Sequence, residues 1–157
     1  MNKVPMTETG YKNLQSELKK LVNTERPAII AEIAEARDYG DLSENAEYQY
    51  AKEQQNLIES KISELENTIM QAEVIDISKL SGKEVMFGAT VKIKDNEADE
   101  QSTYQIVGEY ESDIENKKIS VNSPMARGLI GKSKNDFVEI NSPKGIRFYT
   151  VISVRFQ

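Results

Sequence analysis

Apolar residues recur at helical spacing through the first half of the chain. Between residues 7 and 37 they fall three or four positions apart, which places them along one stripe of a long amphipathic helix. Pro27 lies inside this stretch and removes one helical hydrogen bond, so we expect a bend there within one continuous helix. The stripe consists of Tyr11, Leu14, Leu18, Leu21, Ala28, Ile29, Ile33 and Ala36.

A second helical stripe follows between residues 42 and 72. Its apolar positions alternate four and three apart, the spacing of an a/d seam: Ile58, Ile62, Leu65, Ile69 and Ala72. A short bend containing Gly40 separates the two stripes, so they bury each other only by folding back as an antiparallel hairpin. Arms of about 30 residues reach roughly 45 Å.

The period changes to two after residue 82. Phe87, Ala89, Val91 and Ile93 alternate with polar or small residues, which predicts a half-buried strand. Turn-rich segments separate further short strands at 103–109, 118–122, 137–140 and 146–156. Between them Ser123, Pro124 and Gly131 are suited to cap, start and end a short helix. We therefore predict an α+β chain of two domains, a helical hairpin over residues 1–77 and an antiparallel sheet with one short helix over 78–157.

Composition removes most catalytic schemes. The chain has no cysteine and no histidine, which excludes thiolate chemistry and the commonest general base. We expect a cytoplasmic protein, since no signal peptide or membrane-length apolar run is present. Residues 1–80 hold 9 Lys and Arg against 15 Asp and Glu, a balance of -6, while residues 81–157 balance at 11 against 11. Unassisted nucleic-acid binding by the acidic half is therefore disfavoured.

The bend gathers acids. Asp38, Asp41, Glu44 and Glu47 fall within the segment "ARDYGDLSENAEYQYAKEQQ", residues 36–55. One interpretation is structural: Asp41 caps the second helix and Glu44 completes a capping box. The other is functional: Asp41 and Glu44 supply half of a Mg2+ site, which a partner completes. The residues alone leave both interpretations open.

Two further features of the sequence can each be interpreted in two ways. Arg37 and Lys52 flank the bend, either as solvated partners of acids such as Glu35 and Glu53 or as contacts for a nucleic-acid phosphate. The segment "ARGLIGKS", residues 126–133, is similar to a Walker A loop, but a strand-like sequence follows Lys132 where a P-loop needs a helix. We therefore read it as the end of a capped helix.

Four segments in order resemble the Gre family of bacterial transcript cleavage factors, and the likeness runs over nearly the whole chain. They are "AEIAEARDYGDLSENAEY", "AEVID", "SPMARGLIGK" and "SPKGIRFYTVISV". The resemblance implies an N-terminal antiparallel coiled coil and a C-terminal FKBP-like domain. It also implies that the coiled coil enters the secondary channel of RNA polymerase. There the polymerase itself, and not this chain as an enzyme, hydrolyses backtracked nascent RNA.

The resemblance assigns roles to particular residues. It implies that Asp41 and Glu44 hold a Mg2+ shared with the polymerase, with no cofactor bound by the chain alone. Arg37 and Lys52 match a basic patch near the RNA 3′ end. Ser123, Pro124 and Met125 match a region that docks on the polymerase, and the free protein is expected to be a monomer that binds no membrane. Gly128 and Asn135 depart from the family's usual residues.

Three alternatives accompany this interpretation. The acidic balance of residues 1–80 favours the GreA group over GreB, which has a larger basic surface on its coiled coil. An inhibitory Gre homologue would occupy the same channel without promoting cleavage. A coiled-coil scaffold with an FKBP-like binding domain would not act on transcription at all.

Overall fold

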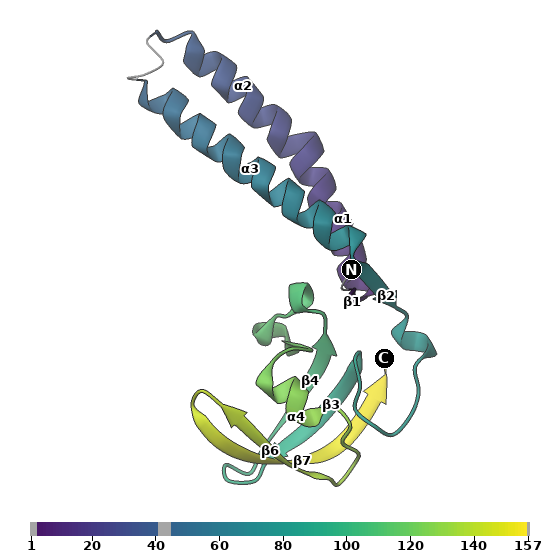
Figure 1. Ribbon diagram of the computed structural model, residues 1–157. Coiled ribbons are helices and arrows are strands. Elements are labelled where there is room, and N and C mark those ends of the chain that lie inside the picture. The colour runs from purple at the N-terminus through teal and green to yellow at the C-terminus, as the bar shows by residue number, and fades with distance from the viewer. Residues whose placement is uncertain (1–2, 41–44, 157) are drawn as a thin grey trace. The chain divides into compact units, whose positions relative to one another are not determined.

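The computed structural model describes residues 3–40 and 45–156 and divides them into two compact units (Figure 1). The first unit contains residues 11–72. The second combines residues 3–10 with the chain from residue 73 onward. The short strand β1 (Val4–Thr7) in that N-terminal segment pairs with β2 (Ala72–Ile75), where the sequence pattern gave no strand.

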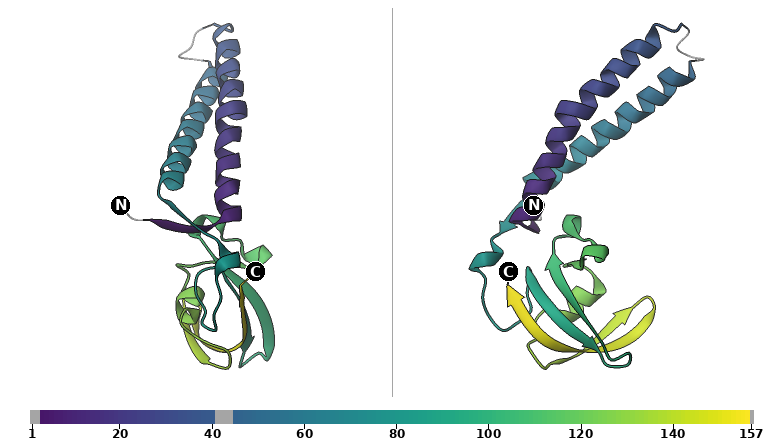
Figure 2. Two further views of the ribbon diagram at one scale, coloured as in Figure 1. Left: turned by 90° about the vertical axis from the view of Figure 1, so that its right-hand side faces the viewer. Right: turned by 180° about the vertical axis from the view of Figure 1, so that it is seen from behind.

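The first unit is a helical hairpin, as predicted. Its outgoing arm contains α1 (Glu8–Lys20), a five-residue π-helical turn (Leu21–Glu25) and α2 (Arg26–Arg37). Its returning arm is α3 (Ala46–Met70), which lies beside α2 in all three views (Figures 1 and 2). The predicted bounds of this second helix, 42 and 72, are too wide at both ends.

The outgoing arm passes Pro27 without breaking. Directly before the proline the helix widens, and the N–H of Arg26 donates to the carbonyl of Leu21, five residues back. A proline ring clashes with the carbonyl four residues before it, here that of Asn23. The π turn accommodates this clash, so the expected bend takes the form of a local change in winding.

The two arms pack through the predicted seam. Near the tip, Ile29 and Ile33 of α2 bury against Ala51 of α3. Farther along α3, Ile62 and Leu65 are buried as well, while Ala28, which the pattern placed in the stripe, is exposed.

An ion pair between the two arms adds to this packing. Arg26 donates from Nε and Nη2 to the two carboxylate oxygens of Glu59, at 2.7 and 2.8 Å. This hydrogen bonding lowers the pKa of the Glu59 carboxyl below its usual value. The bidentate geometry adds specificity to the alignment of the two helices, because a guanidinium fits a carboxylate best in one orientation.

The second unit is built on a curled five-stranded sheet in the order β5-β4-β3-β7-β6. Its strands are β3 (Ala89–Asp95), β4 (Glu100–Val107), β5 (Lys118–Ser120), β6 (Phe137–Ser142) and β7 (Gly145–Phe156). Neighbours pair antiparallel except β4 and β5, which pair parallel. The expectation of a purely antiparallel sheet is therefore wrong at this edge. The single-turn helices Glu109–Glu111 and Ile114–Asn116 return the chain only as far as Gln105, in the last part of β4, so β5 runs parallel to β4 and no hairpin forms.

The core of this unit lies between the sheet and α4 (Pro124–Leu129), which fills the hollow of the curled strands (Figure 1). Ala126 and Leu129 of α4 are fully buried. Gly128 faces β6 so closely that an added Cβ would meet Ile140 Cγ1 at 3.0 Å. Glycine has a low helix propensity and weakens this helix. Because it has no side chain, however, it lets the helix approach the sheet closely.

A single carboxylate ties the N-terminal segment into this unit. Glu111 Oε2 accepts from the N–H groups of Thr7 at 3.0 Å and Gly108 at 2.9 Å, and its Oε1 accepts from the Thr7 hydroxyl. That hydroxyl in turn accepts from the N–H of Gly10 at 3.1 Å and so caps α1. Three polar groups from two distant segments donate to this one side chain.

We expect Glu111→Gln to lower the free energy of unfolding by about 1 to 3 kcal/mol, because the amide loses the negative charge that strengthens these bonds and places a donor where the Thr7 hydroxyl needs an acceptor. Urea denaturation followed by circular dichroism measures the change. Glu109→Gln, in the same helical turn but exposed, is the matched control and should be near neutral. Equal effects of the two substitutions would contradict the role given to Glu111.

Candidate functional site

The tip of the hairpin is the part of the chain that the sequence marks for function. The last helical residue of α2 is Arg37, and Asp38 is its C-cap. Gly40 follows with φ of +117°, a conformation that favours glycine. Asp41 and Glu44, the two predicted metal-binding carboxylates, lie outside the described residues. The structure does describe the residues on either side of them, up to Gly40 and from Asn45.

Asn45 closes the tip from the returning side. Its Oδ1 accepts from the backbone N–H of Tyr48 at 3.1 Å, which makes it the N-cap of α3. Its Nδ2 donates to the backbone carbonyl of Ala36 in the last turn of α2, at 2.7 Å. One side chain therefore satisfies a free N–H at the start of one helix and a carbonyl at the end of the other.

The cap at Asn45 tests the structural interpretation of the acids. The structural interpretation gave Asp41 the N-cap of the returning helix, with Glu44 in a capping box. The helix instead begins at Ala46 with Asn45 as its cap, so that assignment is wrong. Asn and Asp are nearly equal in N-cap preference, so the type of residue alone did not distinguish the two positions.

A small hollow lies between the arms just behind the tip. It has a volume of about 260 Å³ and is lined by Glu32, Glu35, Ala36, Tyr39, Glu47, Tyr50 and Ala51. Tyr39 is 68% exposed and Tyr50 62% exposed, whereas Tyr48 is half-buried against the seam. Tyr48 therefore packs at the bend, whereas Tyr39 does not. The sequence pattern gave Tyr50 no role. Its spacing of two residues from Tyr48 places it off the seam.

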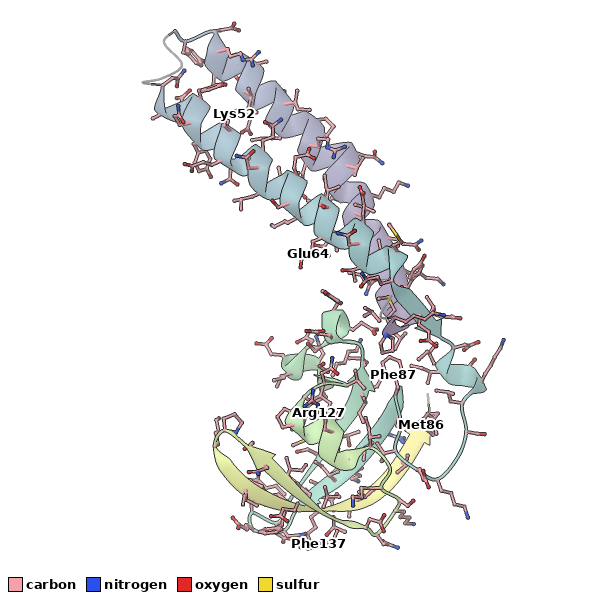
Figure 3. All side chains as sticks on the ribbon, in the orientation of Figure 1. Lys52, Glu64, Met86, Phe87, Arg127 and Phe137 are labelled. Atoms are coloured by element: carbon pink, nitrogen blue, oxygen red, sulfur yellow. The ribbon has the colours of Figure 1, made fainter. Side chains whose placement is uncertain are left out.

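The two flanking basic residues lie on opposite arms. Arg37 is exposed in the last turn of α2, and Lys52 lies near the start of α3 (Figure 3). Lys52 Nζ donates to Gln55 Oε1 at 3.0 Å. Within residues 3–40 and 45–156 neither residue forms an ion pair with an acid, so the pairing with Glu35 or Glu53 considered from the sequence is not observed.

The predicted docking segment starts α4 in the second unit. Ser123 is the N-cap, and its hydroxyl accepts from the N–H of Ala126 at 3.2 Å. Pro124 is exposed at the first helical position, and Met125 packs against the core. Ser123 therefore acts as the predicted cap, and Pro124 is the most exposed residue of the three. Arg127, also exposed on this helix, was not assigned a role (Figure 3).

Comparison with known proteins places both units in one family. Residues 4–74 match the family model described as transcription elongation factor, N-terminal, and residues 80–156 match that of transcription elongation factor, GreA/GreB, C-term. The chain belongs to the GreA/GreB family. This confirms the resemblance drawn from the tip sequence and identifies the chain as a transcription elongation factor of the transcript cleavage class.

Relatives within the GreA/GreB family favour the GreA group. Transcription elongation factor GreA of Phenylobacterium zucineum is 54% identical over 99% of both chains, and GreA of Chelativorans sp. is 56% identical over the same shares. Among solved structures, the GreA factor homolog 1 protein of Thermus thermophilus aligns with 98% of this chain and 99% of its own, at 25% identity and a TM-score of 0.45.

Metal-binding clusters and membrane-spanning helices are both absent from the residues that the structure describes. No group of three or more acidic side chains in residues 3–40 and 45–156 is arranged to hold a metal ion. In the same part of the chain, no helix combines the length and apolarity that a membrane span requires.

We expect Asn45→Ala to loosen the tip, because it removes both hydrogen bonds, at a cost of about 1 to 3 kcal/mol. Asn45→Asp keeps the acceptor for Tyr48 but loses the donor to Ala36, so it should protect the start of α3 and free only the end of α2. Amide hydrogen exchange resolves the two effects. Rapid exchange at Tyr48 in Asn45→Ala but not in Asn45→Asp is the expected result, and unchanged exchange in both would rule out the closure.

Proposed function

We propose that the coiled-coil tip enters RNA polymerase and presents Asp41 and Glu44 to its catalytic centre, where they promote hydrolysis of backtracked RNA. The observation that supports this most directly is the capping of α3 by Asn45. Because Asn45 satisfies the helix start, neither acid is needed for that task. Acids crowded at a tip repel one another, and the cap gives no structural compensation for that repulsion.

The donor set suits Mg2+. Carboxylate oxygens are the protein ligands that this ion prefers, and it commonly takes one or two of them together with water and substrate phosphate. Asp41 and Glu44 would hold the ion together with groups of the polymerase and the RNA. When bound, the ion supplies an activated water and stabilises charge on the phosphate. The chain is in this proposal a partner in the polymerase's own reaction and not an enzyme by itself.

Residues around the acids serve to place them. Asn45 fixes the position at which the returning helix begins, and it does so by bonding to the last turn of α2. Arg37 and Lys52 are not held by carboxylates in the described structure, which leaves their charges available for an RNA phosphate. Pro124, exposed at the start of α4, offers a surface for docking on the polymerase, with Ser123 and Met125 holding that turn in place.

The decisive test is RNA cleavage in a stalled, backtracked polymerase complex with the full chain. Asp41→Asn and Glu44→Gln should each reduce stimulated cleavage by about 100-fold or more, because each removes a ligand charge from a metal site that stabilises the reaction by several kcal/mol. Binding to the polymerase is measured separately and should change little.

The same tip offers matched controls. Asp38→Asn and Glu47→Gln remove the same charge from described, exposed positions on either side. They should keep cleavage within about threefold of the wild type, since exposed charges interact weakly. Equal losses in all four variants would reduce the proposal to a general effect of negative charge. Unimpaired cleavage in the first pair would reject it, and tight binding without any cleavage would indicate an inhibitory factor.

The basic pair has a smaller expected effect. Arg37→Gln and Lys52→Gln should each raise the factor concentration needed for half-maximal cleavage by about three- to tenfold and flatten its salt dependence, since each removes one phosphate contact. Lys61→Gln, on the exposed side of α3 away from the tip, is the control and should behave as the wild type. The proposed RNA contact fails if Lys61→Gln and Lys52→Gln are indistinguishable.

A further inference from the structure

A second cavity lies in the sheet unit. It has a volume of about 440 Å³, within the range of small-molecule sites. Three segments form it: the turn before residue 85, the loop between α4 and β6, and the C-terminal part of β7. Its lining residues are Gly82, Lys83, Ser133, Lys134, Ser153 and Val154.

Backbone hydrogen bonds hold two walls of this cavity in place. The N–H of Val85 donates to the carbonyl of Lys132 at 2.8 Å, beside a bridge between Glu84 and Ser133. The N–H of Asn135 donates to the carbonyl of Val151 on β7 at 2.7 Å, and Asn135 adopts a φ of +75°. The loop is thus attached on both sides, so the cavity exists before any ligand binds and little ordering is required for binding.

The lining has the chemistry of an anion site. Lys83 and Lys134 reach the cavity from different segments, and neither forms an ion pair with any described residue. Ser133 and Ser153 add hydroxyl groups, which donate to phosphate oxygens as readily as to water. No carboxylate is among the lining residues.

Two more cations lie on the same part of the sheet. Lys92 is directly opposite Ser153 in the pairing of β3 with β7, and Arg155 is opposite Thr90. Since the alternate residues Val91 and Val154 face the core, Lys92 and Arg155 occupy the outer face. Neither is paired with an acid within the described residues.

Two acids lie close by and weaken the positive field. Asp136 Oδ2 accepts from the N–H of Ser133 at 2.8 Å, so this carboxylate is engaged in holding the loop. Glu84 follows Lys83 and is exposed. Against these two charges stand the four cations, a local balance that favours an anion.

We propose that this cavity binds a phosphate group, with Lys83 and Lys134 neutralising its charge and Ser133 and Ser153 donating hydrogen bonds. The group belongs either to a free nucleoside triphosphate or to a nucleic-acid backbone, which present the same chemistry. The site is not a P-loop: α4 ends at Leu129, and the backbone after it pairs with residues 84 and 85 instead of starting a helix. The rejection of a Walker A loop from the sequence is confirmed, although Ser133 from that segment lines the cavity.

The test is calorimetric titration of the full chain at low ionic strength, without divalent ions so that the acidic tip takes no part. Tripolyphosphate, ATP, AMP and a ten-nucleotide oligothymidylate are the probes. The variant Lys83→Ala/Lys134→Ala should bind about tenfold or more weakly to whichever probe the wild type binds, since it loses two charge-assisted contacts. A preference for ATP identifies a free nucleotide, and a preference for the oligonucleotide identifies a nucleic-acid backbone.

The control is Lys12→Ala/Lys61→Ala, which removes the same charge from exposed helical positions. It should bind as the wild type does. Amide shifts in a nitrogen–proton correlation spectrum should move at Gly82, Ser133 and Ser153 on titration. The proposal is overturned if no probe binds at millimolar concentration, if both double variants lose affinity equally, or if shifts occur elsewhere. Its failure leaves the function proposed for the tip unaffected, because it shares no residue with it.

Discussion

The interaction on which the tip depends is the pair of hydrogen bonds made by Asn45. A helical hairpin must satisfy the last carbonyls of one arm and the first N–H groups of the other, where no helical partner exists. Asn45 contributes to both, accepting from the N–H of Tyr48 and donating to the carbonyl of Ala36, because an amide side chain carries an acceptor and two donors. An aspartate at this position would cap the returning helix but offer nothing to the carbonyl of Ala36.

Because Asn45 is the N-cap of α3, the acids that precede it in the sequence do not have that role. A carboxylate used as an N-cap is committed to backbone N–H groups and is a poorer ligand for a metal. With Asn45 as the cap, the preceding acids are released from that commitment. The cross-arm pair of Arg26 and Glu59 and the buried seam meanwhile hold the two arms in register. The contacts that hold the two helices together therefore lie along the arms.

Periodic features were predictable from the sequence, and contacts between distant residues were not. The seam of Ile33, Ile62 and Leu65 follows from spacing alone, as does the strand containing Val91 and Ile93. The cap of α4 at Ser123 was equally visible, because serine before proline is a local signal. The cap of α3 was misplaced because Asp41 and Asn45 both precede acceptable helix starts, and choosing between them requires knowing that Ala36 lies within reach. The residues alone left Asp41 and Glu44 between a capping role and a metal-binding role, and family resemblance favoured the second.

The clamp made by Glu111 shows the same limit more clearly. Thr7 and Glu111 are far apart in the chain, and nothing near either residue signals that they meet. The parallel pairing of β5 arises likewise from a return path through two short helical turns, which pattern does not encode. Where function depends on such contacts, as with cations from separate segments lining one cavity, it follows that sequence alone reveals the residue types but not the site. Charge totals also do not locate such residues: residues 81–157 balance at zero, yet Lys83 and Lys134 line one cavity with no carboxylate among its described lining residues.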